Sequence, residues 1–233
     1  MIIRRLSDGI RRQDWFTVVV EVVIVVVGVY VGIYIGDAAN DRAEQKDITA
    51  TLKVLQTQLE ADLENVDKIH DYRVKRFDLN ADIIKFLSSP IKDKQKLTET
   101  LHSGGGYFTF FPNMSAFQSM RNQGYLAKIS DPDLKFELAN LYDSIYERLK
   151  VNSKQSDDAS SFYWLENQNV YWDSIKHDFI GDPTIAKSRI QNGIKGVMRF
   201  SALYIDLLKG TIRPELIKSI ASLKSHLEKN GNN

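Results

Sequence analysis

The chain has 233 residues, and its 31 lysines and arginines nearly balance its 30 aspartates and glutamates, for a formal net charge of +1. This balance excludes a partner, nucleic acid included, that is attracted by the charge of the whole chain. The absence of cysteine excludes disulfides, thiolate metal sites and a cysteine nucleophile. Hydrophobic residues make up 43% of the chain, which is enough for a packed core and excludes wholesale disorder.

An unbroken apolar stretch runs from Phe16 to Gly36, and Glu21 is its only acidic or basic side chain. At about 1.5 Å per helical residue it is about 31 Å long, which matches the hydrocarbon core of a bilayer. A lone segment in lipid can satisfy its own backbone hydrogen bonds only as a helix. We therefore predict a transmembrane helix at 16–36.

A cleaved signal peptide is the alternative for this stretch. Gly36-Asp37-Ala38 loosely resembles a cleavage site, and basic residues precede the apolar run. The apolar core of a signal peptide, however, spans roughly 7–15 residues, and this run is longer. We therefore expect an anchor that stays attached.

The charges on either side of the apolar stretch predict its orientation. After it, Arg42 and Lys46 stand among four acidic residues, whereas four arginines precede it: Arg4, Arg5, Arg11 and Arg12. Positive residues next to a membrane span stay in the cytoplasm. We expect a basic cytoplasmic tail at 1–15, with everything after Gly36 on the far side. In a double-membraned bacterium, that places the chain in the inner membrane with a periplasmic domain.

One face of the predicted transmembrane helix is small and polar. At about 100° per residue, five of its residues fall within a sector of about 80°, with a sixth at its border. This Glu/Gly face consists of Thr17, Glu21, Val25, Gly28, Gly32 and Gly36. Glycines four residues apart let two helices approach closely, so we expect association with a second copy or with another membrane protein.

Glu21 is the costly member of the Glu/Gly face. An acidic side chain at this depth costs about 2–3 kcal/mol unless it is protonated or partnered. Two interpretations stay open: a functional group with a partner, or a carboxylic acid that desolvation keeps protonated.

Phe16-Thr17 followed by Glu21 in a valine-rich helix resembles the start of type IV pilins and secretion pseudopilins. Two features depart from that pattern. The glutamate of those families is the fifth residue counted from the Phe, whereas Glu21 is the sixth, and Trp15 stands where cleavage needs a glycine. A pilin-like assembly subunit is kept as an alternative to the anchored protein.

After the membrane span we predict a long helix at 37–87, a helical extracytoplasmic domain at 88–229 that packs on it, and a disordered tail at 230–233. No proline or glycine occurs from Asp37 to Phe86, and Ser88-Ser89-Pro90 ends the helix. Its apolar residues recur every three or four positions: Ile48, Leu52, Leu55, Leu59, Leu63, Val66 and Ile69. Past Leu52 this stripe is expected to pack on later helices rather than form an intermolecular coiled coil. Continuity past His70 stays open.

Residues 101–113 are the least helical part of the chain. Their three consecutive glycines lack the Lys and Ser or Thr of a phosphate-binding loop. We expect the aromatic residues beside them to form a short extended piece that plugs the helical core, rather than an exposed loop: Tyr107, Phe108, Phe110 and Phe111.

Capping signals predict the next helices. A short helix is expected to start at Asn113 or Ser115 and to be closed by Gly124. Asp131 and Pro132 then provide a cap and a first-turn proline. The helix they open carries the clearest amphipathic stripe in the chain: Leu134, Leu138, Leu141, Ile145 and Leu149.

Three further helices complete the expected domain. The first is expected to start at Ser156-Asp157 and to end at Gly181-Asp182-Pro183. Its apolar residues are Phe162, Leu165, Tyr171, Trp172, Ile175 and Phe179. The second extends from Ile185 to Leu208 and is closed by Gly210, and Pro214 opens the last. The predicted fold class is all-α: a transmembrane helix continuing into a long helix, then a bundle of about five or six helices.

Motifs for catalysis, cofactors and metals are missing. The four histidines are far apart in sequence, and carboxylate pairs such as Asp157-Asp158 are typical of caps and solubilising charge. No GxSxG or SxxK places a nucleophile. Acidic residues accompany the lysines and arginines locally, which gives no basic surface for nucleic acid. We expect no catalytic, cofactor-binding or metal-binding residues.

Two stretches resemble a large bacterial family of uncharacterised single-pass membrane proteins, known as a domain of unknown function. The first is Glu21-x6-Gly28-x3-Gly32. The second starts at Phe111-Pro112-Asn113 and continues as x2-Ala116-Phe117-x2-Met120-x3-Gly124-x-Leu126-x2-Ile129-x-Asp131-x2-Leu134. The chain departs from the family at Gly32, where Ala is usual, and at Gly36-Asp37, where an Asn-Trp signal is missing. The resemblance implies an architecture over most of the chain and no established activity.

We therefore expect a non-catalytic, single-pass membrane-anchored interaction or scaffold protein. Membrane lipid and a copy of the chain or another membrane protein are its expected partners, with a periplasmic partner that the sequence does not identify. Besides the pilin-like subunit, a second alternative is a membrane-anchored sensor or enzyme with a pocket between helices.

Overall fold

The structure is a computed structural model that describes residues 15–90, 96, 99, 108–173, 175, 176 and 178–231. The chain divides into two compact units, Met1–Ala50 and Thr51–Asn233. The boundary falls within α2 (Trp15–Ser88), a helix of 74 residues.

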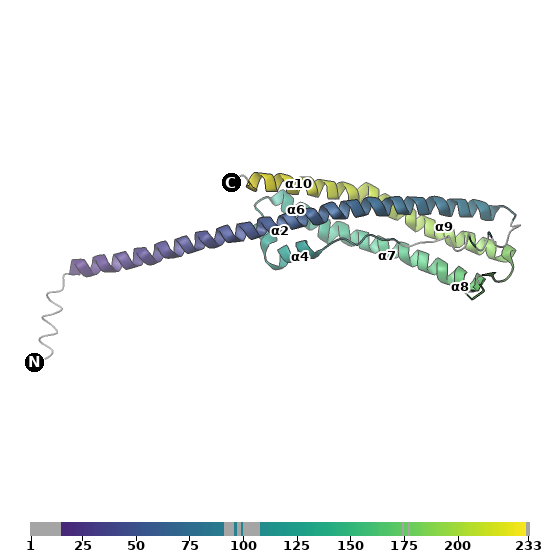
Figure 1. The fold of residues 1–233 in the computed structure, drawn as a ribbon, viewed down its shortest axis with the longest axis horizontal. Coiled ribbons are helices and arrows are strands. Elements are labelled where there is room, and N and C mark those ends of the chain that lie inside the picture. Colours follow the sequence, from purple (N-terminus) through teal and green to yellow (C-terminus); the bar gives the residue numbers. More distant parts are fainter. Residues whose placement is uncertain are drawn as a thin grey trace, which may run out of the picture. The chain divides into compact units, whose positions relative to one another are not determined.

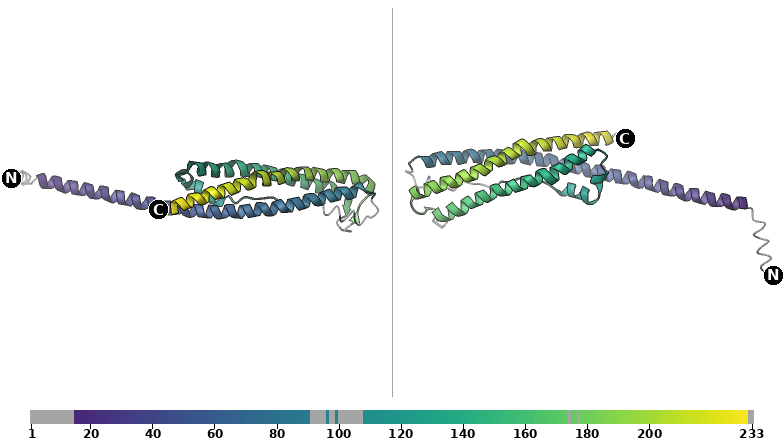
Figure 2. Two further views of the ribbon diagram at one scale, coloured as in Figure 1. Left: turned by 90° about the horizontal axis from the view of Figure 1, so that it is seen from above. Right: turned by 180° about the vertical axis from the view of Figure 1, so that it is seen from behind.

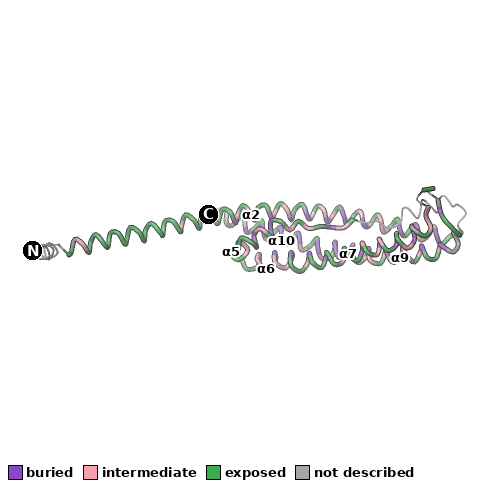
Figure 3. The backbone as a smooth tube through the Cα atoms, turned by 90° about the horizontal axis from the view of Figure 1, so that it is seen from below, coloured by how far each residue is buried: buried purple, intermediate pink, exposed green. Residues whose placement is uncertain are grey.

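The first unit contains the predicted transmembrane segment as part of α2. From Val19 to Ile35 the valines and isoleucines are exposed around the whole helix, and none of the most apolar window is buried (Figure 3). Length and composition make this helix able to cross a membrane.

The described part of the second unit is mainly helical, with one hairpin and an extended segment at 108–113 (Figure 1), and the predicted all-α class is confirmed. The last part of α2 is followed by α4 (Ser115–Asn122), α5 (Tyr125–Lys128), α6 (Pro132–Asn140), η1 (Leu141–Ile145), α7 (Tyr146–Tyr163), η2 (Trp164–Gln168), α8 (Asn169–Tyr171), β1 (Trp172–Asp173), β2 (Asp178–Phe179), α9 (Pro183–Leu207), η3 (Leu208–Ile212) and α10 (Arg213–Gly231). The two strands are antiparallel, with Trp172 opposite Phe179.

Within the second unit, α7, α9 and α10 lie lengthwise beside residues 51–88 of α2 (Figures 1 and 2). The predicted stripe faces the core, because Leu52, Leu55, Leu59, Val66 and Ile69 are all buried. Further along α2, Ile83 and Leu87 pack with Tyr163 and with one face of α9: Ala186, Ile190, Ile194 and Val197. The later helices therefore supply the partner that the stripe predicted.

Several predicted boundaries are confirmed. The α2 helix ends at Ser88, as predicted, and it runs past His70 without a break, a point that the sequence left open. Gly124 adopts φ 74°, a left-handed conformation that glycine allows, where α4 gives way to α5. The Asp131 carboxylate caps α6 by accepting hydrogen bonds from the backbone N–H groups of Asp133 and Leu134.

The prediction that a helix starts at Ser156-Asp157 is wrong. The α7 helix runs through both residues, since Ser156 and Asp157 face Arg73 of α2 instead of capping a new helix. The helical prediction also extended too far, because helix ends at Tyr171 and the β1–β2 hairpin follows. Three of the apolar residues assigned to its packing face are exposed: Phe162, Leu165 and Ile175.

The break predicted at Gly210 is also wrong. The π-turn η3 joins α9 directly to α10. Pro214 has no N–H to donate to the carbonyl four residues earlier, that of Gly210, and the wider turn accommodates its ring. The α10 helix reaches Gly231, within the predicted tail at 230–233, and residues 232 and 233 lie outside the described part of the chain.

The extended segment at 108–113 partly matches its prediction. Phe110 is buried and plugs the core, whereas Phe108 and Phe111 are exposed. Tyr107 and the three glycines before it lie outside the described residues.

Gly193 marks a close approach of α9 to the end of α7. A Cβ at this position would lie 2.7 Å from Cδ2 of Tyr163 and 2.8 Å from Nδ2 of Asn167. Such distances require a neighbour to shift, and both neighbours are buried.

Gly193→Ala is expected to destabilise the second unit by about 1–3 kcal/mol, because overpacking forces buried side chains to move. Urea denaturation of the full-length protein in detergent, followed by tryptophan fluorescence, measures the change. Gly210→Ala is the control, since no described atom lies within 4 Å of its Cβ position. Equal stability of the two variants would contradict the close approach.

Candidate functional site

Apart from Thr17, the predicted Glu/Gly face has no packing partner within the described part of the chain. Glu21, Val25, Gly28, Gly32 and Gly36 are exposed along α2. No described atom lies within 4 Å of a Cβ added at any of the three glycines. The side chain of Thr17 and the arginines at 4, 5, 11 and 12 lie outside what the structure describes.

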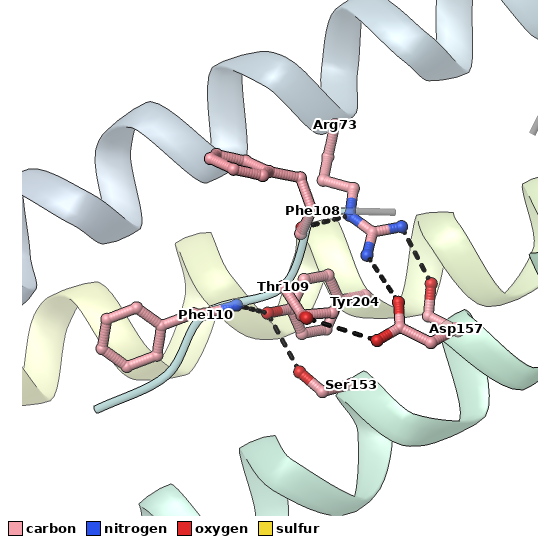
Figure 4. Close-up of polar contacts among 8 residues, drawn as sticks. Arg73, Phe108, Thr109, Phe110, Ser153, Asp157 and Tyr204 are labelled. Atoms are coloured by element: carbon pink, nitrogen blue, oxygen red, sulfur yellow. Dashed lines mark hydrogen bonds and ion pairs between the residues drawn. The ribbon is translucent and has the colours of Figure 1, made fainter. Parts of the chain in front are cut away.

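A buried arginine that the sequence interpretation missed organises the second unit. Arg73 of α2 is 2% exposed. Its Nε donates to the carbonyl oxygen of Phe108 at 2.9 Å, Nη1 donates to the Ser156 hydroxyl at 3.1 Å, and Nη2 is 3.3 Å from an oxygen of Asp157 (Figure 4). One guanidinium therefore joins α2, the extended segment and α7.

The network continues through Asp157 and Tyr204. The other oxygen of Asp157 accepts from the Thr109 hydroxyl at 3.2 Å. The hydroxyl oxygen of Tyr204, on α9, accepts from the backbone N–H of Phe110 at 2.9 Å and from Ser153 at 3.2 Å (Figure 4). Arg73 lies over the Tyr204 ring, with Cζ 5.0 Å from its centroid. Burial raises the pKa of Tyr204, so the phenol stays protonated.

A second buried charge, Asp62, lies three turns before Arg73 on α2 and is 5% exposed. It accepts a hydrogen bond of 2.9 Å from the Tyr146 hydroxyl, and both its oxygens lie 3.3 Å from the backbone nitrogen of Asn113. Burial raises the pKa of Asp62 to about 6, although the hydrogen bonds from Tyr146 and Asn113 favour the charged form.

Together these residues hold the extended segment antiparallel to α2. Arg73 binds Phe108, Asp62 binds Asn113, and Gln58 binds Ser115 and Ala116. From 73 back to 62 an α-helix rises about 16 Å, and the extended chain from 108 to 113 covers a similar distance of about 16 Å. The polar side chains of α2 therefore satisfy backbone groups that the segment, lacking a strand partner, would otherwise bury unpaired.

The chemistry of this network is structural. Arg73 and Asp157 neutralise each other, and Asp62 faces a phenol whose pKa burial raises. Among the described residues, no group of three His, Asp or Glu side chains is placed to hold a metal ion.

Residues of α7 line two hollows, of which the smaller also includes Thr109 and Asp157 of the network. One, of about 460 Å³, lies between the extended segment and α7, with Phe111, Pro112 and Lys150 in its lining. The larger, of about 830 Å³, lies between α7 with η2 and α9, and is called the α7–α9 groove below. Phe162 and Phe200 supply much of its apolar lining.

The sequence held a signal for the buried charges. Buried apolar residues of α2, among them Leu59, Val66, Ile69 and Ile83, recur every three or four positions or at multiples of that spacing. The positions between them that keep this spacing hold three buried polar residues: Asp62, Arg73 and Asn80. The prediction assigned Leu63 to the stripe in place of Asp62, and Leu63 is only partly buried. A polar residue in phase with an apolar stripe indicates a buried polar contact.

Arg73→Met is expected to destabilise the full-length protein by about 3 kcal/mol, since it leaves Asp157 and the Phe108 carbonyl without their buried partner. Thermal or urea denaturation in detergent measures the loss. The control, Lys154→Met, breaks the exposed Lys154–Asp158 pair and is expected to change stability little. Similar effects of both substitutions would show that the network is not a major source of stability.

Asp62 is expected to give the stability a pH dependence. Its folded pKa of about 6 exceeds the ordinary value of 3.8, so the folded chain binds the proton more tightly than the unfolded chain. Protonated Asp62 therefore contributes to the free energy of unfolding, by an amount of the order of 2 kcal/mol. This stabilisation is fully present below about pH 4 and is lost as the pH rises through about 6. Asp62→Asn should remove that part of the pH profile, measured by urea denaturation from pH 4 to pH 8. Asp78→Asn, at an exposed position of the same helix, should leave the pH dependence unchanged. If Asp62→Asn also leaves it unchanged, Asp62 is not its source.

The model of a family described as a family of unknown function (DUF6090) matches residues 21–181. No curated protein and no solved structure matches the chain. The matched region starts at Glu21 and includes the glycines of the Glu/Gly face, Asp62, Arg73 and the extended segment. It also contains both stretches on which the resemblance to a domain of unknown function was based. Because the match covers more than half of the sequence, the chain belongs to this family of unknown function.

Proposed function

We propose that the chain is a non-catalytic membrane-anchored interaction protein. Its N-terminal helix spans the inner membrane of a bacterium once, and the Glu/Gly face of that helix binds a second copy or another membrane protein. The helical second unit is presented on the periplasmic side.

The exposure of the apolar segment carries this proposal. From Val18 to Ile35 the residues are apolar except for Glu21 and the glycines, and almost all are exposed. A core helix of a water-soluble protein would shelter such side chains, since burial of apolar area is the main driving force of folding. Hydrocarbon is the environment in which an all-round apolar helix is stable.

The glycines support association through one face. Each glycine in a helix interior costs about 1 kcal/mol relative to alanine. None of Gly28, Gly32 and Gly36 relieves a clash within the described chain, because the space beside each is open. Their spacing is that of helix pairs that pack closely in lipid, so an intermolecular contact explains them.

Glu21 lies on the same face, and a helix pair would remove its side chain from lipid. Two Glu21 carboxyl groups sharing a proton, or one carboxyl bonded to a hydroxyl or basic group of another protein, would lower the cost of an acid in the membrane. The excess of arginines before the span supports a cytoplasmic N-terminus.

The natural absence of cysteine allows a direct test by crosslinking. Gly28→Cys in the full-length protein, in native membranes, is expected to give several times more oxidised dimer than Val29→Cys, because position 28 lies on the Glu/Gly face and position 29 faces lipid. Non-reducing gel electrophoresis measures the yield. Adding Gly32→Ile to the Gly28→Cys protein should lower its yield by widening the helix pair.

Equal dimer yields at positions 28 and 29 would contradict association through the Glu/Gly face. A heterotypic contact predicts a different product, a crosslink from position 28 to another membrane protein, once that partner carries a cysteine. The Gly28→Cys and Val29→Cys variants must be present at equal amounts in the membrane fraction, so that their dimer yields reflect the geometry of the helix pair and not a difference in membrane insertion.

A further inference from the structure

The α7–α9 groove lies in the second unit and is independent of the membrane contact proposed above. Its volume of about 830 Å³ falls within the range of small-molecule sites, roughly 300–1,000 Å³. Phe162 on its rim is 66% exposed, although it is a large aromatic residue. Folding of the described chain leaves this apolar surface uncovered.

Two glycines of α9 shape the groove. At Gly193 the helix touches Tyr163 and Asn167, so the two walls meet there. At Gly196, about one turn further, no described atom lies within 4 Å of a Cβ position, and the walls separate. The hollow therefore exists because a side chain is missing at 196, where even a modest one would occupy part of it.

Two residues in the lining of the groove, Tyr163 and Asn167, have buried polar atoms that the fold leaves without partners. Asn167 is 3% exposed, and its amide nitrogen donates to the carbonyl oxygen of Tyr163 at 2.9 Å. A carbonyl oxygen can only accept, so the nitrogen must face it, and Oδ1 of Asn167 is left with no hydrogen-bond partner among the described residues. The hydroxyl of Tyr163, which also lines the groove, has none either within that part of the chain. Buried polar atoms of this kind are rare in folded proteins and call for a partner.

Asn167 belongs to the π-turn η2, which interrupts the helix at the groove. Single π-turns inside α-helices occur frequently at functional sites, because the inserted residue redirects the side chains that follow it. Here the turn brings Asn167 against Tyr163 and α9.

The charges at the rim neutralise one another. Glu166 forms an ion pair with Arg189 across the groove, and Asp158 pairs with Lys154 at 2.7 Å. An incoming ion would have to break one of these pairs, whereas a neutral molecule would not. The open acceptor on Asn167 requires a donor, an O–H or N–H group, from the occupant.

We infer that the α7–α9 groove binds a neutral, largely apolar small molecule that carries a hydroxyl or N–H group, which donates to Oδ1 of Asn167. The apolar body lies against Phe162 and Phe200, and the Tyr163 hydroxyl completes the polar end. A helix from a second copy fits this chemistry less well, since its backbone N–H groups are already used within the helix and only a narrow group reaches the buried amide.

Photo-crosslinking tests this inference on the full-length protein in lipid nanodiscs. The probe is decanol with a diazirine in its chain, and mass spectrometry of peptides locates the label. Saturable labelling of α7 and α9 peptides that unlabelled decanol suppresses is expected. Labelling confined to 16–36, where the probe meets lipid, would overturn the proposal.

Matched glycine substitutions test the location. Gly196→Leu fills the groove without a clash at Cβ and is expected to reduce the α7 and α9 labelling about tenfold or more. Gly210→Leu, the same change at another open position outside the groove, is expected to leave it unchanged. Circular dichroism should show the same helix content in both. Equal labelling of the two variants would place the probe elsewhere.

The nature of the competitor tests the hydrogen bond. Decanol should compete at about five- to tenfold lower concentration than its methyl ether, which has the same chain and no donor. Equal competition would overturn the donor requirement. A dimer of the second unit that Gly196→Leu abolishes, without any labelling of α7 and α9, would identify a second copy as the occupant and would also overturn the proposal. None of these outcomes depends on crosslinking at Gly28, so the two proposals fail separately.

Discussion

The apolar side chains of α2 from Val18 to Ile35 have no shelter within the described protein. Burial of a valine or isoleucine contributes about 1.5–3 kcal/mol, so leaving a whole row of them in water would cost far more than a domain's net stability. A surrounding that is itself apolar removes this cost. The assignment of a membrane anchor, the orientation of the chain and the role of the Glu/Gly face all depend on that single requirement.

In the second unit, apolar residues of α2 are buried by other helices of the same chain. From Leu52 onward α2 has one apolar stripe, and its few polar members are its most specific features. Asp62 and Arg73 bind backbone groups of a segment that has no sheet or helix to satisfy them, which places Phe110 in the core. The buried charges of Asp62 and Arg73 stabilise the fold, whereas Asn167 and Tyr163, which line an open groove, have buried polar atoms without hydrogen-bond partners. Among the described residues with such unpaired atoms, Asn167 and Tyr163 are the two in the groove lining.

Periodicity and capping residues were sufficient to predict the helical class, the end of α2 and the α6 cap, because these are local properties of the chain, whereas the continuity of α2 past His70 was left open. The sequence did not reveal that α7 passes through Ser156-Asp157, since their partner, Arg73, is distant in sequence and only the fold brings them together. The π-turns escaped prediction for a similar reason: tertiary packing lets the helical chain continue from α9 through η3 into α10, past Gly210 and Pro214, which usually end helices. The groove depends on the absence of a side chain at Gly196, and a lone glycine gives no signal in sequence.

Alkaline carbonate extraction of membranes from cells that express the full-length chain tests the central claim most directly. The proposed membrane span from Val18 to Ile35 predicts that the protein stays with the sedimented membranes after the wash and is released only by detergent. Recovery of the intact chain in the supernatant as a compact monomer, with residues 16–36 still attached, would contradict the account.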